Sequence, residues 1–402
     1  MTNSILLPKL GMARRHIKPS VNFKSASVCM KLAFSVEALA PKLTGIGRYT
    51  WELAARLPEE DIESIKYFCQ NRWINDLSVL VNPQRRESGK HRENLWPTLP
   101  VWCRKVRIAH CLRDRLFHGP NYFVPEEASL AIATVHDLSV FKFPETHPMA
   151  RLEQFEREFH RSMARVAHII TDSDATRMEV IDFLGWPASK VTVVPLGVSP
   201  SFKPRALDKL AWRLDRYGLV PFQYSLCVST LEPRKKIDTL LLAYQNLPHQ
   251  LRMQYPLVLV GDSGWKSDVL HGEIARFSRE GWLRYIGFVT EEDLPFVYSG
   301  ARSFFYPSIY EGFGLPVLEA MASGVPVVTS NLSSLPEVTQ GAALLVDPEN
   351  VDLLSECIHR CIVDNDWRRA ACARGVQVAS SYTWERCVGE TVAAYRHVIA
   401  ES

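Results

Sequence analysis

The stretch YPSIYEGFGLPVLEAMASGVPVV, residues 306–328, carries two glutamates, Glu311 and Glu319, around a glycine-rich turn. The apolar run SFFYPS leads into EGFG, and LPVLEAMASG has the pattern of a helix that ends at Gly324. Pro316 suits the first helical turn, where its missing N–H costs no hydrogen bond. The stretch therefore predicts a strand, a loop and a helix, which is the repeating unit of parallel α/β sheets.

The same stretch predicts a ligand site. Glycines before a helix let a ligand approach the backbone, and the exposed amides at the helix start favour an anion such as phosphate. We expect Glu311 in the loop and Glu319 one turn inside the helix, both at the carboxyl edge of the sheet. Two carboxylates repel a phosphate, so we interpret them as acceptors for hydroxyls on either side of it, a ribose and a hexose. The alternative is an acid pair that complements the helix dipole, which explains Glu319 but not its spacing from Glu311.

Short apolar segments and amphipathic segments alternate along all 402 residues, a length that favours two domains. The expected strands are 31–36, 65–69, 115–118, 132–136, 168–171 and 191–195 in the first half, and 224–229, 257–261, 284–288, 303–306, 326–329 and 343–346 in the second. The expected helices are 47–56, 150–166, 176–183, 238–247, 315–322, 351–363 and 385–399. We place the linker near 195–210 and interpret 71–100, which is polar and poorly periodic, as an excursion or mobile loop.

Charge and cysteine content exclude several classes of protein. The net charge of +3, from 47 Lys and Arg against 44 Asp and Glu, is too balanced for a nucleic-acid footprint. No apolar run approaches the length of a membrane span. The nine cysteines, an odd number without a Cys-x-x-Cys pair, predict reduced thiols and a cytoplasmic protein. Residues 1–30 hold five basic and no acidic residues, which predicts a disordered leader or weak adhesion to an anionic membrane.

A second cluster, LEPRKK, places Arg234, Lys235 and Lys236 after the first strand of the second half. Cations at the start of a helix oppose its dipole, which argues against a merely solvated helix start. Preorganised cations stabilise the charge that grows on a departing diphosphate. The cluster therefore predicts a phosphate-binding site in the second domain.

These motifs together carry a resemblance. EGFGLPVLE resembles the Glu-x7-Glu signature of retaining glycosyltransferases of the GT-B fold, family 4. STLEPRKKIDTLLLAY, TVHDLSVFKFPETHP, TGIGRYTWEL and VVPLGV resemble the same family in the same order, from about residue 31 to the C-terminus. HDLSVFKFPETHP is most similar to bacterial mannosyltransferases of O-antigen and exopolysaccharide assembly.

The resemblance implies a role for individual residues. Glu311 would contact the donor sugar, Glu319 the ribose, Lys235 and Arg234 the diphosphate, and His136 the donor sugar, with Glu311, His136 and Lys235 as the catalytic group. Many members have an arginine four positions before Arg234, where this chain has Thr230, so Arg234 would carry more of the load. Further donor contacts are implied for Gly312, Phe313, Gly314, Leu315, Gly287 and Phe288, and a cleft loop for Gly45, Gly47 and Arg48.

A metal-like spacing in TDSDAT needs a separate interpretation. Asp172 and Asp174 have the spacing of the metal site in the other large glycosyltransferase fold. They also end a strand and open a helix, where Ser and Asp are ordinary N-caps. We interpret them as caps and expect neither a metal nor a cofactor, because Arg and Lys supply the countercharge.

The resemblance implies a GT-B enzyme with two Rossmann-like domains whose parallel sheets face a central cleft. We expect an acceptor domain at 31–200, a donor domain at 201–384, and a C-terminal helix at 385–402 that crosses back to the first domain. The implied reaction moves a hexose, with mannose from GDP-mannose as our first choice, onto a lipid-linked saccharide with retention and by front-face displacement. GDP-rhamnose and UDP-sugars remain alternative donors, and peripheral contact with the inner membrane is expected, but no nucleic acid.

Two other classes remain open. A Rossmann-type oxidoreductase needs Gly-x-Gly-x-x-Gly after its first strand, and TGIGRYTW lacks the third glycine. A non-catalytic protein that binds nucleotide sugars would keep the fold but lose some of Glu311, Lys235 and His136, all of which are present.

Overall fold

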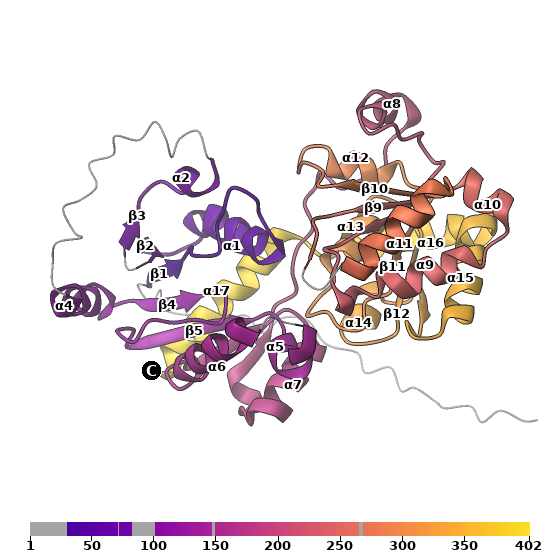
Figure 1. The fold of residues 1–402 in the computed structure, drawn as a ribbon. Helices are drawn as coiled ribbons and strands as arrows, with labels where there is room; N and C mark the ends of the chain where they lie inside the picture. Colours follow the sequence, from indigo (N-terminus) through magenta and orange to yellow (C-terminus); the bar gives the residue numbers. More distant parts are fainter. Residues whose placement is uncertain (1–29, 71, 83–100, 147–148, 265–267) are drawn as a thin grey trace, which may run out of the picture.

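The structure is a computed structural model that describes residues 30–402 apart from 71, 83–100, 147–148 and 265–267. The basic leader, except Met30, and most of the predicted polar excursion lie outside the described residues. The described chain forms two lobes, each a parallel sheet with helices on both faces (Figure 1). The prediction of an α/β architecture with two Rossmann-like domains is confirmed.

The first lobe is built on a seven-stranded sheet in the order β3-β2-β1-β4-β5-β6-β7. All neighbours are parallel except β2 and β3. The strands are β1 Lys31–Ser35, β2 Ser64–Cys69, β3 Arg72–Ile74, β4 Leu116–Gly119, β5 Leu130–Val135, β6 His168–Thr171 and β7 Val191–Val193. The helices around them are α1 Gly45–Arg56, α2 Ser78–Val81, α4 Val101–Leu112, α5 Ser139–Lys142, α6 Met149–Met163 and α7 Asp174–Leu184.

The second lobe has a six-stranded parallel sheet in the order β10-β9-β8-β11-β12-β13. Its strands are β8 Ser225–Val228, β9 Leu257–Val260, β10 Leu283–Gly287, β11 Ser303–Tyr306, β12 Val327–Ser330 and β13 Leu344–Val346. Its helices are α8 Leu207–Asp215, α9 Ile237–Gln245, α10 His249–Gln254, α11 Asp268–Arg279, α12 Leu294–Ser299, α13 Leu315–Ala322, α14 Leu335–Thr339, α15 Val351–Val363 and α16 Asn365–Ala379. A short 3-10 turn, η5 Pro233–Lys235, precedes α9.

The strands are apolar runs because helices cover both faces of each sheet. Every residue of β4, β6, β9, β11 and β12 is buried. In each sheet the chain order reverses beside the first strand, between β1 and β4 and between β8 and β11. Open α/β sheets bind ligands at this switch point, outside the carboxyl ends of the strands. The loops after β8 and β11 are therefore the expected place for a donor site.

Some local predictions were wrong. The segment 71–100 was expected to be an excursion, but β3 and α2 form within its described part. The linker was placed near 195–210, but α8 begins at Leu207 because Leu210 and Leu214 bury one face of a short helix. Helices α2, α4, α5, α8, α10, α11, α12, α14 and α16 were not predicted, since they are short or their apolar positions are few or interrupted by polar residues and glycine.

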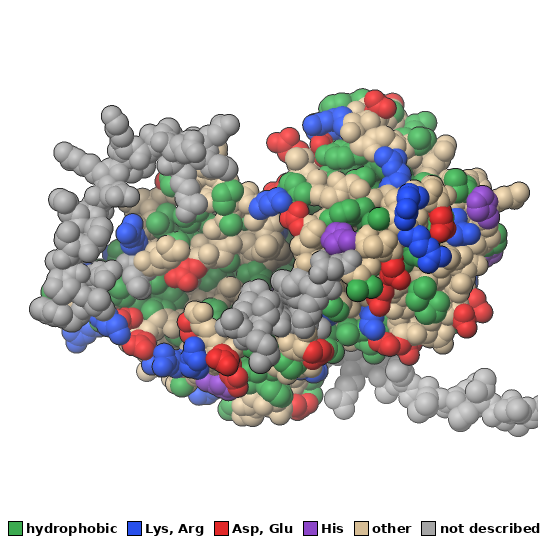
Figure 2. Space-filling model, in the orientation of Figure 1, with side chains coloured by type: hydrophobic (Ala, Val, Ile, Leu, Met, Phe, Trp, Pro, Cys, Tyr) green, Lys and Arg blue, Asp and Glu red, His purple; other side chains and the backbone are tan. Residues whose placement is uncertain are grey.

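The last helix, α17 Trp384–Glu401, leaves the second lobe and packs on the first, as predicted. It runs along the first sheet in Figure 1, and the C-terminus lies among the elements of the first lobe. Tyr395 of α17 bonds to His118 of β4 at 2.6 Å, and Glu385 pairs with Arg56 of α1 at 3.2 Å. The surface is indented between the two lobes (Figure 2). Among the described helices, none has the length and apolarity required to cross a membrane.

Candidate active site between the two lobes

The centre of the site is a buried cluster formed by Lys235, Glu311 and Tyr306. Lys235 lies in η5 after β8, while Tyr306 ends β11 and Glu311 lies in the loop that follows. Because β8 and β11 are neighbours, their carboxyl ends meet. Lys235 Nζ donates to Glu311 Oε1 at 2.5 Å and to the Tyr306 hydroxyl at 2.9 Å, and Tyr306 donates to Glu311 at 2.9 Å. The fold thus brings the acidic motif EGFG and the basic motif LEPRKK together at the carboxyl ends of β11 and β8.

Arg234 is held beside this cluster by several carboxylates. Its guanidinium donates to Glu232 at 2.9 Å and to the Tyr310 carbonyl at 2.8 Å, and lies 3.9 Å from Asp137 and 4.0 Å from Glu311. Burial alone would lower the pKa of Arg234, but Glu311, Asp137 and Glu232 outweigh it and raise that pKa. Burial would likewise raise the pKa of Glu311, but the charges of Lys235 and Arg234 outweigh it and lower that pKa. Both side chains are therefore charged at neutral pH.

The loop of Glu311 packs directly on the first lobe. A Cβ on Gly312 would lie 1.8 Å from the backbone oxygen of His136, so only glycine fits at this contact. The Gly312 carbonyl accepts from Ser173 at 2.7 Å and from Thr176 at 3.2 Å. These bonds join the loop after β11 to the start of α7, and the contact with His136 joins it to the loop after β5. The cleft is closed at this point by backbone contact between the lobes.

His136 lies at the carboxyl end of β5, as expected, but its ring nitrogens contact protein groups. Nδ1 lies 2.7 Å from Asp172 Oδ2 and Nε2 lies 2.8 Å from the Pro120 carbonyl oxygen. The hypothesis that Asp172 and Asp174 cap the helix was wrong in detail, because Ser173 is the N-cap and accepts from Thr176. Asp174 lies in the first turn of α7, and Asp172 points to His136.

Glu319 lies in α13, the helix that follows the Glu311 loop. Burial raises the pKa of its carboxyl to about 7, although the nearby charge of Arg48 opposes this shift. Arg48 comes from α1 of the first lobe and pairs with Glu291 of the second. Glu319 is thus a partly buried acid within electrostatic reach of both lobes.

A cleft loop was predicted at Gly45, Gly47 and Arg48, but these residues form the first turn of α1 because Thr44 caps the helix. The loop before this helix makes contacts across the cleft. Lys42 Nζ lies 2.9 Å from Asp262 and 4.1 Å from the centre of the Phe288 ring. Gly47 is closely packed, since a Cβ there would lie 3.1 Å from the Ala38 oxygen, whereas Gly45 faces open space. Lys42 was not predicted, and its position before the Gly-x-Gly turn was the available signal.

The remaining predicted donor residues differ in what they expose. Phe313 is buried and packs against Tyr382, so only its backbone is available to a ligand. Gly314, with φ of 106°, is the N-cap of α13, and Leu315 begins that helix. Gly287, with φ of 67°, ends β10, and the Phe288 side chain that follows is 47% exposed. The first three residues thus form a helix start, and the last two border the cleft.

Sequence reasoning missed Tyr306 and Glu232, and it interpreted Asp172 as a helix cap rather than a partner of His136. Tyr306 and Asp172 lie at or just after the carboxyl end of a parallel strand, which is the signal that identified His136. Glu232 precedes the basic pair in LEPRKK, and its carboxylate lies 3.8 Å from Lys235 and 2.9 Å from Arg234. Each was passed over because an ordinary structural role explained its type and position.

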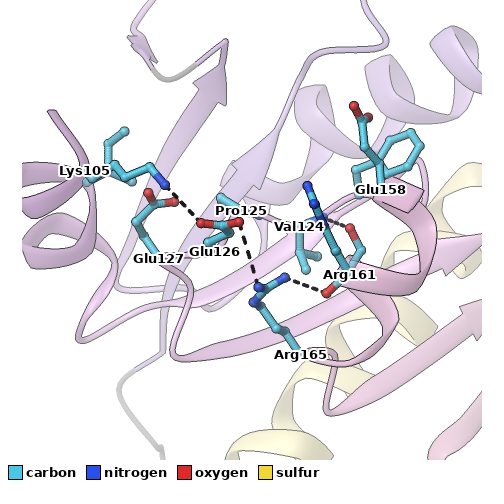
Figure 3. Close-up of a pocket in the computed structure, with 11 residues that line it drawn as sticks. Lys105, Val124, Pro125, Glu126, Glu127, Glu158, Arg161 and Arg165 are labelled. Carbon is cyan, nitrogen blue, oxygen red and sulfur yellow. Dashed lines mark hydrogen bonds and ion pairs between the residues drawn. The ribbon is translucent and has the colours of Figure 1, made fainter. Parts of the chain in front are cut away.

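A separate pocket of about 460 Å³ lies on the first lobe between α4, the loop after β4 and α6 (Figure 3). Lys105 in its lining pairs with Glu126 at 3.0 Å. Glu126 also lies 4.0 Å from Arg165, which follows the C-terminal end of α6. None of the predicted site residues lines this pocket, so we assign the chemistry to the cleft.

Comparison with known proteins identifies the family. Residues 43–202 match the family described as Glycosyltransferase Family 4, and residues 221–376 match Glycosyl transferases group 1. The chain is 41% identical over 379 residues to O-antigen chain mannosyltransferase B of Escherichia coli. The alignment covers 91% of this chain and 100% of that protein. The chain belongs to the family 4 glycosyltransferases. The glycosyltransferase expected from its motifs is thereby confirmed.

Other relatives of this glycosyltransferase support the family and the fold. The serotype-specific mannosyltransferase WbdA of Escherichia coli is 29% identical over 326 residues, which are 74% of this chain and 38% of WbdA. Sucrose-phosphate synthase from Thermosynechococcus elongatus superposes with a TM-score of 0.69 at 22% identity, covering 93% of this chain and 100% of the synthase. HepE from Anabaena, in complex with UDP and glucose, superposes with a TM-score of 0.66 at 18% identity, covering 92% of this chain and 100% of HepE. The GT-B fold is thereby confirmed.

Proposed function

We propose that this glycosyltransferase moves mannose from GDP-mannose onto a lipid-linked saccharide during assembly of a cell-surface polysaccharide, with retention at the anomeric carbon. The name of the 41% identical relative, an O-antigen chain mannosyltransferase, supports the sugar and the pathway. The observation that carries the proposal is the contact of Lys235 with Glu311 at 2.5 Å, next to Arg234 and in the loop that packs on the His136 carbonyl. This contact supports the proposal because cations that would suit a diphosphate lie beside a carboxylate that would suit a sugar.

Lys235 and Arg234 stabilise the departing diphosphate. An ammonium has three N–H groups, and two of those on Lys235 are used by Glu311 and Tyr306. The third is available for a phosphate oxygen. Lys235 is buried and the Arg234 side chain is 12% exposed, so the charge on the leaving group is stabilised in a medium of low dielectric constant. The amides at the start of α13 add to this stabilisation.

Glu311 stabilises the sugar as positive charge develops on it. Its carboxylate is ionised because Lys235 and Arg234 keep its pKa low. Glu311 is itself paired with Lys235, so we assign it an electrostatic role and propose front-face displacement assisted by the leaving phosphate. Glu319 holds the ribose, and His136 lies on the sugar side of the Gly312 loop. The start of α1, with Gly47 and Arg48, borders the diphosphate and the acceptor.

The acceptor binds mainly on the first lobe, and we propose that it is lipid-linked. The enzyme then works in the cytoplasm, in peripheral contact with the inner face of the membrane. Co-sedimentation with vesicles that carry a polyprenyl diphosphate saccharide tests this part. Equal amounts of protein in the pellet with and without vesicles contradict the proposed membrane contact.

The donor is tested by calorimetry with GDP-mannose, GDP-rhamnose and UDP-glucose. We expect GDP-mannose to bind most tightly and to release GDP when an acceptor is present. Preference for GDP-rhamnose or a UDP-sugar changes the donor but keeps the enzyme class. Tight binding without turnover with any acceptor saccharide supports a non-catalytic binding protein.

Glu311→Gln tests the assignment of the site. Removing the carboxylate takes away stabilisation of the sugar cation, so turnover should fall by roughly tenfold or more. The affinity for GDP should stay nearly unchanged, because Glu311 serves the sugar. Lys235→Ala is the matched variant, since loss of a charge-assisted hydrogen bond should weaken the binding of GDP by about ten- to hundredfold. Near wild-type turnover in Glu311→Gln would contradict the assignment of the active site to this cluster.

We also propose that transfer needs no metal ion. Arg234 and Lys235 supply the positive charge that a divalent ion supplies in other glycosyltransferases. Turnover measured in excess EDTA should therefore match turnover in its absence. Loss of turnover in EDTA that manganese restores contradicts this expectation.

A further inference from the structure

His136 is held at both ring nitrogens by atoms that accept hydrogen bonds. The Pro120 carbonyl oxygen lies 2.8 Å from Nε2, and Asp172 Oδ2 lies 2.7 Å from Nδ1. The side chains of His136 and Asp172 are 8% and 3% exposed, so water does not compete for these bonds. A neutral imidazole carries one N–H and can donate to only one of two acceptors. Both contacts are satisfied together when the ring carries two protons.

We propose that Asp172 is a positioning residue that holds His136 as an imidazolium. This ring, hydrogen-bonded at both nitrogens, fixes the first-lobe wall of the active site. Pro120, His136 and Asp172 follow β4, β5 and β6, which are three successive neighbours in the sheet. Each residue therefore tethers one strand end to the next. Nothing in the family assignment or in the proposed transfer gives Asp172 this role.

The charges of His136 and Asp172 stabilise each other against burial. Burial raises the pKa of the Asp172 carboxyl, and the charge and hydrogen bond of His136 oppose that rise. Burial alone would lower the pKa of His136, but the Asp172 charge, its hydrogen bond and the Pro120 carbonyl outweigh it and raise that pKa. Asp137 acts in the same direction, and its own partner Arg234 lies 3.9 Å away. The other titratable groups facing the pair are kept neutral at pH 7 by burial, namely His118, Tyr49, Tyr122 and Cys387.

The position of the His136 ring affects catalysis through the backbone of the same residue. The carbonyl oxygen of His136 lies against Gly312, where a Cβ would approach to 1.8 Å. Ring contacts with Tyr49 at 4.9 Å and Tyr122 at 6.1 Å confine the imidazole on its other sides. Loss of the second proton removes one tether and loosens the wall against which the Glu311 loop packs. Turnover should therefore fall as pH rises through the pKa of His136.

The protonation state can be measured without substrate. Protein labelled with ¹⁵N-histidine, with His136→Gln to assign the signals, should show two protonated ring nitrogens for His136 at pH 7.5. An ordinary histidine, with a pKa near 6.5, is neutral at that pH. One unprotonated nitrogen on His136 at pH 7.5 overturns the proposal. This result does not depend on the proposed transfer reaction.

Substitutions of Asp172 test the role in catalysis, which rests on the proposed function. Asp172→Ala removes the tether, so turnover should fall roughly tenfold or more while GDP affinity changes less than about twofold. Asp172→Asn can donate to Nδ1, so both tethers persist with a neutral ring. It should keep most of the turnover and lose the decline at high pH. Asp174→Asn, two positions away and exposed, is the matched control and should behave as wild type.

Two outcomes would overturn the positioning role. The first is wild-type turnover with an unchanged pH profile in Asp172→Ala. The second is an Asp172→Asn variant that is as slow as Asp172→Ala, because the amide restores both contacts. Circular dichroism of both variants establishes that each is folded before turnover is compared.

Discussion

Glu319 is the residue whose ionisation should control donor binding. Burial raises the pKa of its carboxyl to about 7, so the group is mostly protonated at pH 6 and mostly ionised at pH 8. If the ionised carboxylate accepts hydrogen bonds from the ribose, affinity for the sugar nucleotide should rise about tenfold between these pH values and then level off. Calorimetry with GDP-mannose measures this, because its diphosphate bridge does not titrate in the range.

The control at this scale is Glu319→Gln. The affinity of this variant for GDP-mannose should be independent of pH between 6 and 8. The substitution should weaken the binding of GDP-mannose and of GDP about equally, since both contain the ribose. A pH dependence that persists in Glu319→Gln would assign the titration to another group.

The loop between β11 and α13 is the element on which the two lobes meet. In Gly312→Ala the new Cβ would lie 1.8 Å from the His136 oxygen, and that atom is backbone, which cannot rotate away. Overpacking of this kind costs about 1–3 kcal/mol. We expect turnover to fall roughly tenfold or more while circular dichroism shows a folded protein.

Gly45→Ala is the matched control for this element. Gly45 belongs to the predicted cleft loop, but a Cβ there meets nothing within 4 Å and alanine favours the helix that begins at this residue. Its turnover should match wild type. Equal turnover in Gly312→Ala and Gly45→Ala would show that the lobes do not meet at Gly312 during catalysis.

The whole molecule is tied together by α17 through a buried polar chain. The Tyr395 hydroxyl bonds to His118 Nδ1 at 2.6 Å, and His118 Nε2 bonds to Thr134 at 2.9 Å. Burial lowers the pKa of His118 to about 3, so the ring is neutral. Tyr395→Phe leaves a buried ring nitrogen without its partner and should destabilise the protein by about 1–3 kcal/mol. A lowered midpoint in thermal unfolding measures the effect.

The neighbouring Arg396→Ala is the control for α17. Arg396 is about half exposed and lies 4.0 Å from Asp61, so its loss should change stability by less than about 0.5 kcal/mol. A Tyr395→Phe variant as stable as Arg396→Ala would mean that the crossing helix does not depend on His118.

Local pattern determined the elements and the candidate residues of this chain. Strands β6 and β11 and helices α13 and α15 have the predicted boundaries, because apolar periods and capping residues act over a few positions. Glu311 and Lys235 were found for the same reason, since parallel strands present loop residues at one edge of the sheet. Helix α8 escaped prediction because short helices with few buried residues leave a weak pattern.

Only the tertiary structure decided which of these residues meet. The order of strands puts Asp172 on His136 rather than at the start of α7, and it brings the Tyr306 hydroxyl within hydrogen-bond distance of both Lys235 and Glu311. The tight contact of Gly312 with the His136 carbonyl joins residues far apart in the chain. Such contacts depend on strand order and on the packing of one lobe against the other. Neither leaves a periodic signal in the sequence, because both arise from burial summed over the whole chain.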